Sequence, residues 1–112
     1  MATPASPQLT FVRSDNEIVQ ITITSDSAGT TPVDITGRTY VMSIAASPGG
    51  TVVTSATGTV TGGSGLVVFT FATAKTVLLT GTVYVYDVVE TSGGVESTIM
   101  LGGLSVLTGV TA

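Results

Sequence analysis

The chain has 112 residues, a formal net charge of −4, and neither histidine nor cysteine. One domain is expected at this length, without disulfides, a thiolate nucleophile, or the imidazole that most often serves as general base or zinc ligand. Its three lysine and arginine residues are too few for the basic surface that nucleic-acid binding requires, so nucleic acid is not an expected partner.

The opening of the chain, residues 1–7, contains two prolines and is expected to form an extended arm before a domain that covers residues 8–112. The arm has neither the basic start nor the apolar stretch of a secretory signal. No apolar run in the chain approaches the ~18 residues that a membrane-spanning helix needs. A membrane is therefore not an expected partner.

Most of the chain alternates β-branched or aromatic residues with threonine and serine. Val19, Ile21 and Ile23, for example, alternate with Gln20 and Thr22, which is the pattern of a strand with one face in a core. Glycine-rich turns separate such runs. The pattern predicts seven strands, at residues 8–13, 17–24, 38–46, 51–60, 65–71, 81–90 and 95–107.

Two segments depart from strict alternation. Residues 73–79 lose the period of two and are expected to form a short helical turn. Gly102-Gly103 lies inside the last expected strand, where we expect a bulge or kink. Short strands with these turns predict an all-β sandwich or barrel.

The aromatic side chains all lie within expected strands, so core packing is their expected role. Tyr84 also follows a turn at residues 78–81 and could tie that turn through its hydroxyl, as the tyrosine of a sandwich corner does. The six strand aromatics are Phe11, Tyr40, Phe69, Phe71, Tyr84 and Tyr86.

The carboxylates show no spacing that would bring two of them into one cleft, as general acid–base catalysis requires. We expect them on solvated surfaces and in turns. Asp15-Asn16-Glu17 could offer several oxygens to Ca²⁺, but it lacks the ligand spacing of an EF-hand loop, and a turn is the expected role. The seven carboxylates are Asp15, Glu17, Asp26, Asp34, Asp87, Glu90 and Glu96.

Glycine-rich residues 62–65 do not lead into Gly-Lys-Ser/Thr and a helix, so they predict a hairpin loop rather than a phosphate cradle. Lys75 alone does not indicate a Ser–Lys dyad. We therefore expect no enzyme, with no catalytic, cofactor-binding or metal-binding residues and no cofactor.

Three stretches in this order resemble a known family: the strand pair of residues 9–13 and 18–23, residues 32–44, and residues 79–90 with Leu101-Gly102-Gly103 and the terminal Val110-Thr111. They resemble the small immunoglobulin-like domain of tailed-phage virion proteins, of the kind found at the N-terminus of the phage baseplate upper protein. Such domains also occur as free-standing phage structural proteins of this length. The resemblance implies a single immunoglobulin-like antiparallel β-sandwich of about seven strands and no catalytic residues. Ala45-Ala46 stands where such domains often carry arginine and a polar residue, so an interface through that cation is not carried over.

Charged residues make up 9% of the chain, against about 25% in ordinary soluble domains. This scarcity indicates a surface covered by copies of the chain or by another protein, although a Thr/Ser-coated monomer remains an alternative. With the resemblance, it implies a non-enzymatic structural protein of the virion, assembled in the host cytoplasm, with other phage structural proteins as partners. We favour a tail component (baseplate, fibre or fibre adaptor).

A capsid cement or head decoration protein that stabilises the shell is the first alternative, and a carbohydrate- or host-surface-binding module is the second. We expect a homo-oligomer, with a trimer as one candidate. An edge strand or the arm at residues 1–7 is expected to dock on a neighbouring subunit by strand addition.

Overall fold

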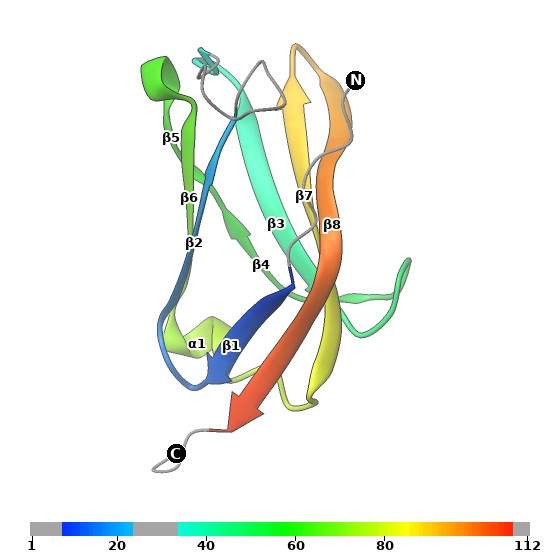
Figure 1. Cartoon of the computed structure of the whole chain (residues 1–112). Coiled ribbons are helices and arrows are strands. Elements are labelled where there is room, and N and C mark those ends of the chain that lie inside the picture. Colours follow the sequence, from blue (N-terminus) through cyan, green and yellow to red (C-terminus); the bar gives the residue numbers. More distant parts are fainter. Residues whose placement is uncertain (1–7, 24–33, 109–112) are drawn as a thin grey trace.

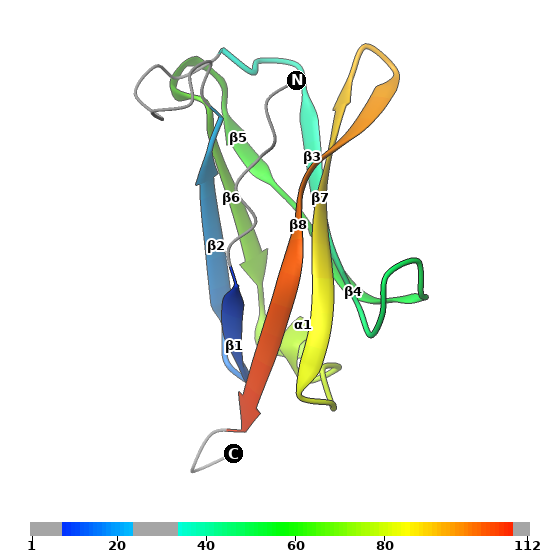
Figure 2. The same ribbon diagram turned by 45° about the vertical axis from the view of Figure 1, so that its right-hand side comes forward.

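Two facing β-sheets make up the protein in the computed structural model, which describes residues 8–23 and 34–108 (Figures 1 and 2). The expected arm at residues 1–7 lies outside the described residues. Five strands form one sheet, in the order β1 (Leu9–Arg13), β8 (Val95–Thr108), β7 (Val83–Ser92), β3 (Thr39–Ala45) and β4 (Val52–Thr57). Three form the other, in the order β2 (Glu17–Thr22), β6 (Leu66–Phe71) and β5 (Thr59–Thr61).

This division of strands confirms the all-β, immunoglobulin-like sandwich. Strands β2, β6 and β5 correspond to strands B, E and D of an immunoglobulin domain, and β8, β7, β3 and β4 correspond to G, F, C and C′. One pairing departs from the expected antiparallel arrangement, because β1 runs parallel to β8 with Phe11 opposite Val106.

The run expected as one strand at residues 51–60 is two strands in different sheets, so the described residues contain eight strands rather than seven. The chain crosses between the sheets at Gly58, whose N–H donates to the Tyr40 carbonyl at 2.7 Å. A side chain at Gly58 would collide with Val67 and Phe69. The crossing therefore requires glycine, because the backbone passes directly over core side chains.

The bulge expected at Gly102-Gly103 was placed wrongly. Both glycines pair in regular register with β7, opposite Tyr86 and Val85, and the register instead shifts at Ile99. The expected hairpin loop at residues 62–65 is confirmed: a single 3₁₀ turn, η1 (Gly62–Ser64), joins β5 to β6.

The core between the sheets contains all six strand aromatics, as expected. The rings of Phe11 and Phe71, from opposite sheets, lie 5.3 Å apart between centroids at an angle of 56°, within the range of favourable tilted ring pairs. Phe69 and Tyr40 are completely buried beside them.

The link between β6 and β7 holds a short helix, α1 (Thr73–Thr76), which ends earlier than the expected helical turn. It is tied to the β1–β2 turn, because Asn16 Oδ1 accepts the Thr73 N–H at 2.9 Å and the Thr76 hydroxyl donates to the Asp15 carbonyl at 2.7 Å. The N–H of Gly81 donates to the Tyr84 hydroxyl at 2.6 Å. The tyrosine corner expected at Tyr84 is therefore present.

Candidate functional site

A charged side chain satisfies a backbone group on each outer edge of the five-stranded sheet. On β1, Glu17 Oε2 accepts the Val12 N–H at 2.6 Å, and the Val12 carbonyl accepts the Asp15 N–H at 3.2 Å. On β4, Lys75 Nζ donates to the Ser55 carbonyl at 2.6 Å. Exposed strand edges invite pairing with other chains, and these contacts oppose such pairing at both edges.

In Asp15-Asn16-Glu17, considered above as a calcium loop, Asp15 and Asn16 belong to the β1–β2 turn and Glu17 begins β2. The Asn16 and Glu17 side-chain oxygens accept hydrogen bonds from Thr73 and Val12. Within the described residues, no three acidic side chains gather into a group that could hold a metal ion. Asp26, another of the expected carboxylates, lies outside the described residues.

A small polar cluster closes one end of the core. The Tyr40 hydroxyl donates to Glu90 Oε2 at 2.6 Å, and Arg38 Nη1 lies 3.5 Å from the same oxygen. Burial, reinforced by the bond to Glu90, raises the pKa of Tyr40 to about 12. Such an arrangement stabilises the neutral hydroxyl, so the cluster fixes strand β3 against β7 rather than supplying a reactive group.

Asp34 stands before the turn that leads into β3. Its Oδ1 accepts both the Thr36 hydroxyl at 2.6 Å and the Thr36 N–H at 3.0 Å. These two bonds lower the pKa of Asp34. Asp34 is thus a turn residue, the role that its sequence context indicated.

The outer face of the five-stranded sheet is the side turned away from the three-stranded sheet. Unlike the hydrogen-bonded polar groups described above, it is mainly apolar. Alternation along the strands places valine and leucine residues there, and several remain exposed. Val83 is 75% exposed and Leu101 is 61% exposed. The large exposed apolar residues of this outer face are Val41, Val52, Val83, Leu101 and Leu107.

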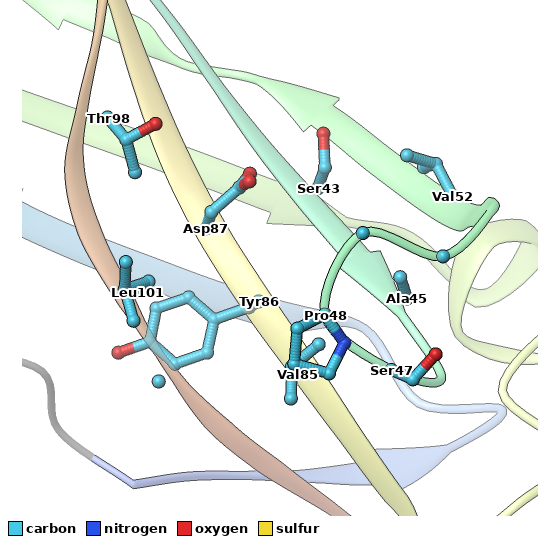
Figure 3. Close-up of a pocket in the computed structure, with 13 residues that line it drawn as sticks. Ser43, Ala45, Ser47, Pro48, Val52, Val85, Tyr86, Asp87, Thr98 and Leu101 are labelled. Carbon is cyan, nitrogen blue, oxygen red and sulfur yellow. The ribbon is translucent and has the colours of Figure 1, made fainter.

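A hollow of about 500 Å³ lies on this outer face, beside the β3–β4 loop (Figure 3). Pro48 of that loop forms one wall, and Val52, Val85 and Leu101 add apolar surface. Three neighbouring strands, β3, β7 and β8, contribute polar side chains to the hollow: Ser43, Asp87 and Thr98.

Asp87 is paired with Ser43 on one side and Leu101 on the other in the sheet register. Among the described residues, no hydrogen bond or ion pair reaches its carboxylate. Of the described residues that line the hollow, Asp87 is the one with a carboxylate. The arrangement offers binding contacts, apolar with a few hydroxyl groups and one charge, rather than an acid–base pair.

The outer face was not identified from the sequence, although one signal was present. From Val83 to Val89, Asp87 is the one charged residue, and valines occupy outward positions where a strand facing water normally carries polar residues. A strand that is apolar on both sides is typical of a sheet covered on both sides.

Within the described residues, no helix has the length and apolar character that a membrane crossing requires. No protein-family model matches the chain, and no curated protein matches it in sequence.

Proposed function

We propose that the chain is a non-enzymatic structural component of a tailed-phage virion, acting in the tail through protein–protein contacts. The residues that resemble phage immunoglobulin-like domains support the virion part of this proposal. The immunoglobulin-like sandwich agrees with that resemblance, since it is the fold that the resemblance implies.

The outer face of the five-stranded sheet is the observation that carries the contact part of the proposal. Val83, Leu101 and Leu107 each leave more than half of their surface in water, and Asp87 is the charge at the centre of this face. Isolated exposed apolar residues are ordinary, but a series of them on one face marks an interaction surface.

The charged residues elsewhere strengthen this interpretation. Glu17, Lys75 and Glu90 each bond to a specific group of the fold, so they stabilise the domain. Among the described residues, the sheet register places two charged side chains on the outer face: Asp87, and Glu96 opposite Thr91. An otherwise uncharged, apolar face favours burial against another protein.

The direct test is to locate the chain in virions of the phage that encodes it. Heads and tails are separated after disruption, and the chain is quantified in each fraction by mass spectrometry. We expect it in the tail fraction; presence in heads at many copies per shell would replace the tail assignment by head decoration. Absence from purified virions would contradict the whole proposal.

A matched pair of variants tests whether the outer face makes the contact. Leu101→Lys places a charge on the outer face, and Thr70→Lys places the same charge on the three-stranded sheet, where Thr70 is also exposed. We expect Leu101→Lys to reduce incorporation into virions several-fold and Thr70→Lys to leave it unchanged. Equal incorporation of both variants would exclude this face as the contact.

A further inference from the structure

Strand β2 has an edge that pairs with no other strand in the described part of the chain, because it lies at the end of its sheet. The Ile23 N–H donates to the Gly65 carbonyl at 2.8 Å, on the side of β6. In an antiparallel pair, residues that bond to the partner strand alternate with residues whose N–H and C=O groups point away. The backbone groups of Ile18, Gln20 and Thr22 therefore point to the open edge.

The other edge strands differ from β2. An acidic side chain occupies the edge of β1 at Val12, and Lys75 occupies the edge of β4 at Ser55. Strand β5 has only three residues. Short edge strands and charged side chains at the edge are the usual devices that prevent pairing. Across the described residues, β2 is the edge where neither device is found.

We propose that β2 pairs with β2 of a second copy of this chain, antiparallel and about a two-fold axis at Gln20. In this register Gln20 opposes Gln20 of the other copy, and Ile18 opposes Thr22. All three open residues then exchange backbone hydrogen bonds, about six in total at two per pair. A register moved by two residues in either direction would use fewer of these groups among the described residues.

The side chains of β2 complement one another in this register. On the outer side, Ile18 is 66% exposed and would pack beside the threonine that faces it. On the inner side, Val19 would oppose Ile21, and both are half-buried at the margin of the core. Glu17 would oppose Ile23 rather than another carboxylate, so no like charges meet, whereas like charges directly opposite each other destabilise a strand pair.

This inference goes beyond the proposed function, because it concerns a contact between two copies of the chain that does not need a virion. It uses the edge of the three-stranded sheet, which leaves the outer face of the five-stranded sheet free for another protein. The product is a continuous six-stranded sheet, since each copy contributes three strands.

The first experiment measures the mass of the purified full chain by sedimentation equilibrium up to millimolar concentration. We expect twice the monomer mass of 11.2 kDa at the highest concentrations. Gln20→Pro removes an N–H that points to solvent in the monomer, a position where edge strands tolerate proline. It deletes two hydrogen bonds at the axis, so we expect the dissociation constant of the dimer to rise about tenfold or more.

The second experiment tests the register and does not depend on proline. Gln20→Lys or Gln20→Glu puts like charges opposite each other at the axis, so each variant alone should dimerise several-fold more weakly at low salt. Mixed in equal amounts, the two variants should form a heterodimer. Thr70→Lys carries the same added charge on the neighbouring strand of the same sheet and should dimerise like the unmodified chain.

Three results would overturn the inference: a chain that stays monomeric at millimolar concentration, a dimer that Gln20→Pro does not weaken, and a mixture of the Gln20→Lys and Gln20→Glu variants that associates no better than either variant alone. None of these results depends on where the chain lies in a virion. A chain that is found in tails but is monomeric in solution would overturn this inference and leave the proposed function intact.

Discussion

The two sides of the five-stranded sheet differ in how their residues are covered. On the inner side, Tyr40, Met42 and Leu104 are fully buried against the three-stranded sheet. On the outer side, Val83 and Leu101 are mostly exposed, although both belong to the same strands as buried residues. One side of the sheet is therefore covered by the three-stranded sheet, and the other side is exposed to solvent.

This difference separates the residues that stabilise the folded chain from the residues that are available for the proposed contact. Inner-side polar groups have partners: the Tyr40 hydroxyl bonds to Glu90, and the Tyr84 hydroxyl bonds to Gly81. The carboxylate of Asp87, on the outer side, has none among the described residues. Substitutions on the inner side should therefore change the stability of the monomer, and substitutions on the outer side should change its association with other proteins.

The largest loss of stability is expected at the crossing between the sheets. Gly58→Ala would place a methyl group against Val67 and Phe69, and forcing extra atoms into a packed core costs ~3 kcal/mol when the neighbours cannot move. Gly63→Ala is the control, because a methyl group there meets no atom within 4 Å. Urea unfolding of the two variants should separate them clearly. If the two variants were equally stable, Val67 and Phe69 would have to be able to move aside for the added methyl group at Gly58.

A smaller loss is expected for Tyr40→Phe, which leaves Glu90 without its hydroxyl donor. Removing one partner of a hydrogen bond to a charged group costs ~2 kcal/mol near neutral pH. Thermal unfolding measures this change directly. A variant as stable as the parent would show that the cluster contributes little to the fold.

The same variant tests the alkaline stability of the inner side. Because the pKa of Tyr40 is raised from 10.0 to about 12 in the folded protein, its stabilising effect is complete below pH 10 and is lost as the pH rises towards 12. Tyr40→Phe should therefore lose less stability over this range than the parent chain. Burial also raises the pKa of Tyr86, so some alkaline loss should remain in the variant.

Tyr84→Phe should have a more modest effect, because it removes the 2.6 Å bond from the Gly81 N–H while keeping the ring in the core. We expect a loss of ~1 kcal/mol, typical of a single neutral hydrogen bond. Faster amide exchange at Gly81 would localise the effect to the corner. Unchanged exchange there would show that water replaces the hydroxyl without cost.

The smallest effect on stability is expected on the outer side. Leu101→Thr keeps a residue suited to strands and alters a side chain that is 61% exposed, so the free energy of unfolding should change by no more than ~0.5 kcal/mol. The same change should still weaken incorporation into virions. A large loss of monomer stability would remove the distinction between the two sides of the sheet.

Local patterns in the sequence were sufficient to predict most of the strands, though not the split at Gly58, and much of the core. Alternation correctly assigned Phe11, Tyr40 and Phe69 to the interior. The glycine that follows α1 and the tyrosine three residues later predicted the corner at Tyr84. These features depend on residues that are close together in the chain, which is why the pattern reveals them.

Features that depend on distant residues were not predictable in the same way. The split at Gly58 arises because Val67 and Phe69 approach from another strand, and no local signal distinguishes that glycine from those in turns. The parallel pairing of β1 with β8 joins the two ends of the described chain. The hollow around Asp87 likewise requires the register of three strands and the position of the β3–β4 loop.

The central claim is that another protein covers the outer face of the five-stranded sheet in the assembled particle. Hydroxyl-radical labelling of intact virions, compared with the purified chain, tests it at individual residues. We predict several-fold less labelling of Val83 and Leu101 in virions, with Leu78, which is exposed on the loop after α1, as the reference for accessibility. Equal labelling of Val83 and Leu101 in virions and in the free chain would contradict the account.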